Sequence, residues 1–156
     1  MFTRTKHGAD KVVRVLNKSG LAAEAIHGNK SQNQRERVLM AFRNGSVRTL
    51  VATDIAARGI DVDLVTHVIN FDVPATAEDY VHRIGRTGRA GNAGQAITLL
   101  TPVDELSMLE IEKLTGQTVE RVVVPGFGGV TLSAKPIRSL DRRGGARSFR
   151  SRRFGR

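Results

Sequence analysis

The chain has no cysteine, so disulfides and thiolate metal sites are excluded. Its four histidines lack the close spacing of metal ligands, which disfavours a histidine metal site. The amino-terminal segment is charged and carries no long apolar run, so the sequence predicts neither a signal peptide nor a membrane span. A cytoplasmic protein is the default expectation.

Acidic residues are scarce near the carboxyl end. The formal net charge is +10, but nine Lys or Arg and one Asp lie between Lys135 and Arg156, which leaves only +2 for the other 134 residues. From Gly126 onward Gly, Ser and Arg dominate, and such a segment cannot bury enough apolar surface to offset its ordering entropy. We therefore expect residues 126–156 to be a disordered basic tail with a polyanion partner such as a nucleic acid, although a merely solubilising tail is the alternative.

A Walker-type phosphate loop is also absent. Gly28–Ser31 has a superficial likeness to one, but Asn29 occupies the position before the lysine where the pattern requires glycine. Ser31 is better interpreted as the N-cap of a helix that runs through Phe42, whose apolar positions are helically spaced.

Short apolar segments alternate with amphipathic ones over most of the chain. The pattern predicts strands at 21–26, 49–53, 65–71, 95–100 and 120–124, and helices at 11–18, 32–42, 77–84 and 104–114. In the last helix, Leu106, Leu109, Ile111 and Leu114 are expected to face inward. This order indicates an α/β fold with a mostly parallel sheet and flanking helices, and functional groups are then expected at the carboxyl ends of the strands.

The stretch Tyr80–Gly91 contains three consecutive Arg-x-Gly triplets. A glycine every third residue weakens a helix by about 1 kcal/mol each relative to alanine, so the arginines from Arg86 onward are expected on a tight loop. Guanidinium groups match phosphate oxygens two at a time. A disordered Arg-Gly segment is the alternative, but the amphipathic segment before the stretch and the apolar one after it favour a place inside a folded domain.

The string at residues 80–89, YVHRIGRTGR, resembles motif VI of the DEAD-box RNA helicases of superfamily 2. Residues 51–61, VATDIAARGID, resemble motif V, and the Phe2-x-x-Thr5 and Gln32-x-x-Arg35 pairs resemble the motif IV and QxxR elements. The resemblance covers about residues 2–125. It implies that residues 1–125 form the second RecA-like domain of this family, with a first strand that is cut short.

The resemblance also implies a role for each matching residue. Arg86 and Arg89 correspond to the arginine fingers that act on ATP, and Asp61 and Gly59 to motif V positions at the nucleotide. His82 and Arg83 correspond to positions that couple the two domains. RNA contact is implied for Thr5, Gly28, Arg35 and Thr53.

No Walker A or DEAD element is present, so the ATP site and its Mg²⁺ ligands would be shared with, or lie on, a first RecA-like domain. The chain is then expected to be the C-terminal half of an ATP-dependent RNA helicase, inactive as an ATPase by itself. Two alternatives remain open. One is a stand-alone RNA-binding module, and the other is a regulatory module that acts in trans on a helicase core.

Overall fold

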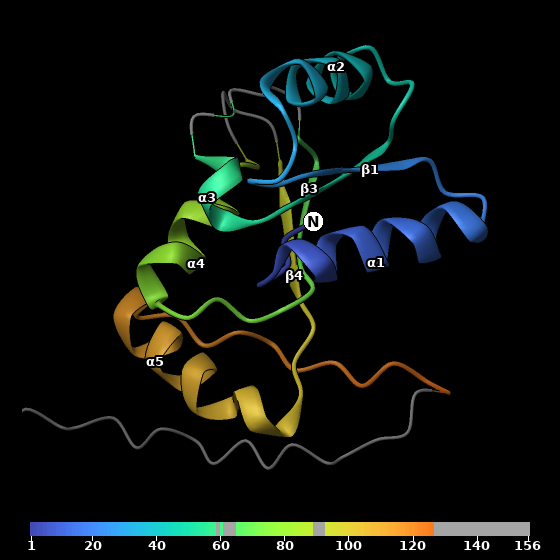
Figure 1. Ribbon diagram of the computed structural model, residues 1–156. Helices are drawn as coiled ribbons and strands as arrows, with labels where there is room; N and C mark the ends of the chain where they lie inside the picture. Colours follow the sequence, from blue (N-terminus) through green and yellow to red (C-terminus); the bar gives the residue numbers. More distant parts are fainter. Residues whose placement is uncertain (59, 61–64, 89–92, 127–156) are drawn as a thin grey trace, which may run out of the picture. The chain divides into compact units, whose positions relative to one another are not determined.

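The computed structural model describes residues 1–58, 60, 65–88 and 93–126 (Figure 1). The chain divides into two units, residues 1–122 and 123–156, and the fold below is that of the first. The predicted basic tail lies outside the described residues, apart from Gly126, so its disorder and the predicted boundary at residue 125 stay predictions.

Helices and strands alternate along the first unit. The elements are α1 (Lys6–Lys18), β1 (Ala23–Ile26), α2 (Gln32–Arg43), β2 (Thr49–Ala52), α3 (Asp54–Ala57), β3 (His67–Asn70), α4 (Ala77–Ile84), β4 (Gln95–Thr98), a short 3-10 turn (Pro102–Asp104) and α5 (Glu105–Thr115). Within the described residues, no helix is long and apolar enough to cross a membrane.

The strands form parallel pairs that the amino terminus joins. β1 pairs with β2, and β3 pairs with β4. Phe2 bridges both Ala52 and Asn70 in parallel, and its N–H donates to Ile69 O at 2.7 Å while its C=O accepts from Phe71 N–H at 2.9 Å. The lateral order is therefore β1, β2, the Phe2 segment, β3, β4. The expected α/β fold with a mostly parallel sheet and flanking helices is confirmed.

Three helices begin at hydroxyl side chains that cap them. Ser31 forms a capping box with Gln34 at the start of α2, as its sequence position predicts, and Thr76 caps α4. Thr5 accepts from the Gly8 N–H at 3.0 Å. This cap explains why α1 begins at Lys6, five residues before the predicted start: a local hydrogen bond supplements the apolar stripe.

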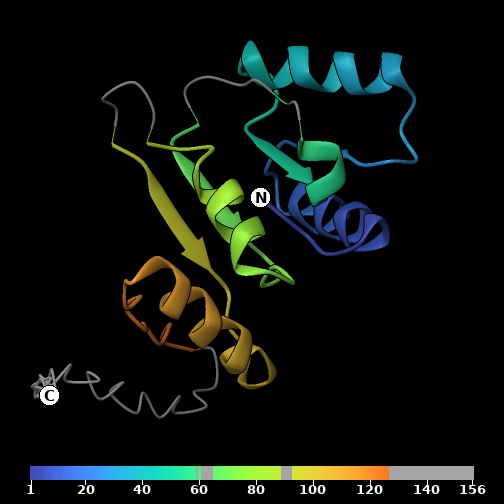
Figure 2. The ribbon, with the colours of Figure 1, turned by 90° about the vertical axis from the view of Figure 1, so that its left-hand side faces the viewer.

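Helices cover the two faces of the β1–β2 half of the sheet, with α1 and α2 on opposite sides of β1 (Figures 1 and 2). On one face, Ala9 and Val12 of α1 pack against Ala25 and Val51. On the other, Ile26, Ala52 and Phe2 form a core with residues that include Ala57 and Val68. A third cluster joins α4 to α5.

The predicted inward face of the last helix is wrong in three of its four positions. Leu106, Leu109 and Leu114 are exposed, whereas Ile111 is buried together with Met108. The reason is that α5 packs on α4, against Val73 and Tyr80, and no further element covers its other side within the described residues.

The predicted strand at 120–124 is also wrong, since this segment has no strand pairing. The buried Glu112 carboxylate accepts from Val119 N–H at 2.8 Å and from Arg121 Nη1 at 2.5 Å. The Arg121 hydrogen bond lowers the pKa of the Glu112 carboxyl. This charged contact holds the segment against α5, so it does not extend the sheet.

Candidate functional site

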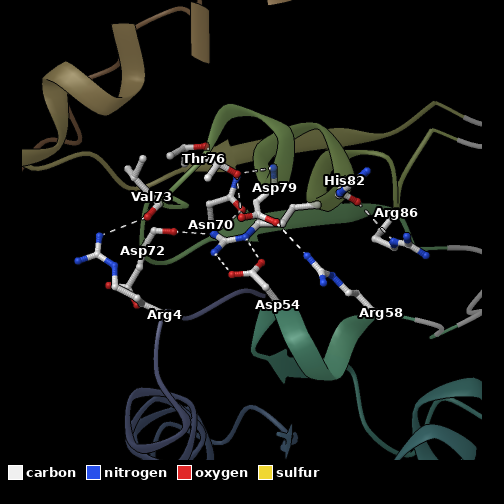
Figure 3. A network of polar contacts seen from close by, with 12 residues as sticks. Arg4, Asp54, Arg58, Asn70, Asp72, Val73, Thr76, Asp79, His82 and Arg86 are labelled. Carbon is white, nitrogen blue, oxygen red and sulfur yellow. Dashed lines mark hydrogen bonds and ion pairs between the residues drawn. The ribbon is translucent and has the colours of Figure 1, made fainter. Parts of the chain in front are cut away.

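A buried arginine organises the polar network between α3, β3 and α4 (Figure 3). Arg83 is 2% exposed, and its Nε and Nη2 donate to the two carboxylate oxygens of Asp54 at 2.6 and 2.8 Å. Its Nη1 donates to Asp72 O at 2.7 Å and to Asn70 Oδ1 at 3.3 Å. The guanidinium also lies 5.1 Å from the Phe2 ring centroid. Such a bidentate, fully bonded pair fixes the position of α4 relative to α3 and the sheet.

A second ion pair joins the same two helices at the surface. Arg58 follows α3, and its Nη2 lies 3.8 Å from Asp79 in the first turn of α4. The Asp79 carboxylate also accepts from the Thr76 hydroxyl at 2.8 Å. Figure 3 shows both contacts beside the Arg83 network.

Arg86 lies directly after α4, on a turn, as the glycine spacing predicts. Its Nη1 donates to Ile60 O at 3.2 Å and its Nε to His82 O at 3.4 Å. The guanidinium is half-buried, and among the described residues its Nη2 has no partner. Because both held nitrogens bond to main-chain oxygens, the side chain has a fixed position before any ligand binds.

The Arg86 turn lies at the amino-terminal end of β3. The Thr87 hydroxyl donates to Val65 O at 2.5 Å, two residues before β3 begins. The expectation that functional groups lie at the carboxyl ends of the strands is therefore wrong for the Arg86 turn, whereas Arg83 contacts Asn70 and Asp72 at the carboxyl end of β3. The physical reason is the connection itself: α4 starts beyond the carboxyl end of β3 and runs back along the sheet.

Three of the predicted RNA residues do follow carboxyl ends of neighbouring strands. Thr5 comes after the Phe2 segment, Gly28 after β1, and Thr53 after β2, and the parallel pairing brings these ends to one edge. Arg35, in the first turn of α2, donates from Nη2 to Ala56 O at 3.2 Å, which joins α2 to α3. Thr5 and Gly28 are exposed, while Thr53 and Arg35 are half-buried.

Polar contacts anchor the loop that carries Gly28. The buried His27 Nε2 lies 3.1 Å from Asp10 of α1, and Lys30 Nζ lies 3.3 Å from the same carboxylate. The hydrogen bond from His27 is the main cause that lowers the pKa of Asp10. Lys6 Nζ donates to Asn29 Oδ1 at 3.1 Å, so α1 holds the loop at both of its ends.

The structure describes only two of the remaining predicted site residues. His82 is exposed on α4, and Arg83 is buried as described above. Gly59, Asp61 and Arg89 lie outside the described residues. Within the described part of the chain, no group of three His, Cys, Asp or Glu side chains could hold a metal ion.

Asp54 is a residue that sequence reasoning missed. Nothing in its local pattern distinguishes it from a solvated acid at a helix start. Only the two long motifs taken together indicate this residue. A buried Arg83 in one motif needs an anionic partner, and Asp54 lies in the other.

Comparisons with known proteins extend these observations. A family profile described as the helicase conserved C-terminal domain matches residues 1–91. The RNA helicase CrhR of Synechocystis sp. is 46% identical over 141 residues, which cover 90% of this chain and 28% of that protein. The DEAD-box ATP-dependent RNA helicase CshA of Bacillus subtilis is 49% identical over 125 residues, which cover 80% of this chain and 25% of that protein.

Solved structures give the same result. E. coli DEAD-box protein SrmB, bound to the regulator RraA, superposes with a TM-score of 0.76 at 36% identity, over 79% of this chain and 72% of that chain. A DEAD box protein from Methanococcus jannaschii gives 0.74 at 39% identity, over 78% of this chain and 34% of that chain. The chain spans about a quarter of the length of the curated relatives it matches.

Proposed function

This chain belongs to the helicase conserved C-terminal domain family and is the second RecA-like domain of a DEAD-box RNA helicase, and from that premise we propose that it works as one half of an ATP-dependent RNA helicase. In this function it supplies arginine fingers to ATP and part of the RNA-binding surface. It hydrolyses ATP only together with a first RecA-like domain, in cis or in trans, which carries the Walker A and DEAD elements.

The observation that carries the proposal is the fixed position of Arg86. Two main-chain oxygens hold its Nη1 and Nε, and its Nη2 has no partner among the described residues. A cation that is already in place when charge develops on a phosphate needs no reorganisation, which is the basis of electrostatic catalysis. Arginine fingers of this kind contribute on the order of a thousandfold in rate.

The Arg86 guanidinium can donate hydrogen bonds to the oxygens of an ATP phosphate. With Arg89 it would hold the γ-phosphate as it leaves ATP. Gly59 and Asp61 would contact the nucleotide. ATP supplies the phosphoryl group, and its Mg²⁺ ligands are expected on the first domain. The buried Arg83 positions α4, and hence the Arg86 turn, while the exposed His82 is free to meet the first domain.

RNA binding is proposed at the edge where the Phe2 segment, β1 and β2 end. Thr5, Gly28, Thr53 and Arg35 belong to this edge, and helices α1 and α2 begin there. Helix amino termini favour anions, so main-chain N–H groups of both helices support contact with the sugar–phosphate backbone. Since ATP and RNA are intracellular ligands, a cytoplasmic location is part of the proposal.

One experiment separates the two roles. The chain is joined to the first RecA-like domain of a DEAD-box relative, and RNA-stimulated ATP turnover and RNA affinity are measured in parallel. Arg86→Ala should lower turnover by at least a hundredfold with little change in RNA affinity, whereas Arg35→Ala should weaken RNA affinity. Lys113→Ala, on the exposed side of α5, is the matched loss of one cation and should change neither. Equal loss of turnover and RNA affinity in Arg86→Ala would mean that Arg86 is not a finger.

One specific observation favours a second candidate function, a stand-alone RNA-binding module. Most of the net charge lies from Lys135 onward, where a polyanion can bind without ATP. The salt dependence described in the Discussion tests this function.

A further inference from the structure

One side of helix α1 carries a row of basic residues. His7, Lys11, Arg14 and Lys18 follow one another at intervals of four, three and four residues, so all four lie on one side of the helix. Each of these side chains is exposed. The apolar side of α1 packs against β1 and β2 instead (Figure 1). These four residues are called the basic row below.

Acidic side chains leave the basic row uncompensated. Within the described part of the chain, none of its cations forms an ion pair. Asp10 is the one acid of α1, and its carboxylate is bonded to the buried His27 and to Lys30. Helix α1 has four Lys or Arg and one Asp, hence a formal charge of +3. That is more than the +2 of residues 1–134 taken together, so the positive charge of this part of the chain is concentrated on α1.

Helix stability does not account for the basic row. Lys18 lies in the last turn of α1, where a cation interacts favourably with the helix dipole. Lys11 and Arg14 lie further from that end, and like charges three or four residues apart destabilise a helix. A polyanion bound along the row would remove this repulsion.

The basic row starts beside the edge proposed to bind RNA. Lys6 Nζ, in the first turn of α1, donates to Asn29 Oδ1 in the loop that follows β1. The other end of α1 lies beside the start of β1, where Asn17 exchanges two hydrogen bonds with Ala23. Since a helix rises 1.5 Å per residue, the row is about 16 Å long. It therefore leads from the proposed RNA edge along the outside of the domain to the opposite edge of the sheet.

The chemistry of the basic row favours a sugar–phosphate backbone over a membrane surface. A helix that lies on a membrane inserts its apolar side. On α1 that side is already used, because Ala9 is 0% and Val12 8% exposed. The row thus offers a ligand mainly charge, in groups about 4.5–6 Å apart along the helix. Regularly spaced phosphates of a nucleic-acid strand match such a row.

We propose that the basic row binds the backbone of an RNA strand that continues past the strand-end edge, and so lengthens the RNA site of this domain. The inference rests on the proposed RNA-binding function and adds contacts that the edge residues do not supply. A short RNA would occupy the edge alone, whereas a longer one would also reach Lys11, Arg14 and Lys18. Because cations contact phosphates without reading bases, binding along the row is independent of base sequence.

The test compares oligouridylates of about 5 and about 16 nucleotides on the ¹⁵N-labelled full chain. Both should shift the amide resonances of Gly28 and Thr53, and only the longer one should shift those of the basic row. The triple variant Lys11→Gln, Arg14→Gln, Lys18→Gln should bind the longer RNA about tenfold or more weakly in about 0.1 M salt. Its log affinity should also fall less steeply with log salt, by about 2, since each phosphate contact contributes about 0.7. Affinity for the shorter RNA should not change.

Two controls separate charge and position from helix stability. Lys11→Arg, Arg14→Lys, Lys18→Arg keeps the charges and should keep the affinity for the longer RNA. Lys113→Gln removes an exposed cation of α5 and should leave the salt dependence unchanged, whereas Arg14→Gln should reduce it by about 0.7.

The outcomes distinguish this inference from the proposed function. Shifted Gly28 and Thr53 amides with an unshifted basic row, or unchanged affinity for the longer RNA in the triple Gln variant, would overturn the inference alone. Unshifted Gly28 and Thr53 amides with both RNAs would overturn the proposed RNA edge as well. Binding to phosphatidylserine vesicles that the triple Gln variant loses, without any change in RNA affinity, would assign the row to a membrane surface and also overturn the inference.

Discussion

Loss of Asp54 should destabilise the first unit more than any other single removal of a surface-accessible carboxylate. Asp54→Ala leaves the Arg83 guanidinium, only 2% exposed, without its bidentate partner. Removing one member of a buried ion pair costs about 3–5 kcal/mol. Because the Asp54 side chain is 30% exposed, water can reach part of the site, and we expect a value near 3 kcal/mol. A domain of this size has a free energy of unfolding of about 5–15 kcal/mol, so the loss is large.

Urea unfolding followed by circular dichroism measures this cost. The double variant Asp54→Ala, Arg83→Met should be more stable than Asp54→Ala alone, since it no longer buries an unpaired charge. Glu120→Ala, which removes an exposed carboxylate, is the matched control and should change the free energy of unfolding by less than about 0.5 kcal/mol. A cost below about 1 kcal/mol for Asp54→Ala would refute the reasoning, because the pair would then contribute no more than a surface contact.

Three further predictions follow from other parts of the chain. Gly94→Ala should lower the free energy of unfolding by about 1–3 kcal/mol in the same urea assay, because the added Cβ would overlap the Gly88 backbone and the Thr87 side chain. Gly28→Ala is the control: its added Cβ has no other atom within 4 Å, so it should cost much less. The pKa of the Met1 amine is about 6 in the folded chain against 8.0 in the unfolded chain. The free energy of unfolding should therefore rise as pH increases from 6 to 8, because the unfolded state binds more protons in this range. Acetylation of the amine should remove this rise, and an unchanged pH dependence after acetylation would contradict the prediction. Removal of residues 126–156 should take away most of the affinity for single-stranded RNA and make that affinity depend less on salt. The logarithm of the affinity falls by about 0.7 per log unit of salt concentration for each phosphate neutralised. A shortened chain with unchanged affinity and salt dependence would place RNA binding on the strand ends alone.

Local signals predicted much of the fold correctly. The amphipathic segment at 77–84 is a helix with those bounds, and Ser31 caps α2, because caps and apolar periodicity depend on neighbours in sequence. The two long motif strings were enough to identify the family, and the glycine spacing correctly predicted that Arg86 lies on a turn after α4.

Features that depend on distant contacts were harder to predict. The inward face of α5 was wrong because its buried apolar residues are Met108 and Ile111, which pack in one cluster with Tyr80 of α4. Periodicity alone cannot tell which apolar residues have a partner. The strand at 120–124 was wrong because the buried Glu112 binds Val119 and Arg121, an interaction that β-propensity does not contain. The pairing of Arg83 with Asp54 joins residues 29 positions apart, so neither local pattern reveals it.

The central claim is that this chain supplies half of an ATPase. The most direct measurement is RNA-stimulated ATP turnover of the chain alone, of a first RecA-like domain from a DEAD-box relative alone, and of the two joined in one polypeptide. The account predicts no turnover for either half and RNA-dependent turnover for the joined protein. RNA-stimulated hydrolysis by the isolated chain that Arg86→Ala abolishes, or a joined and folded protein with no turnover above its separate halves, would contradict it.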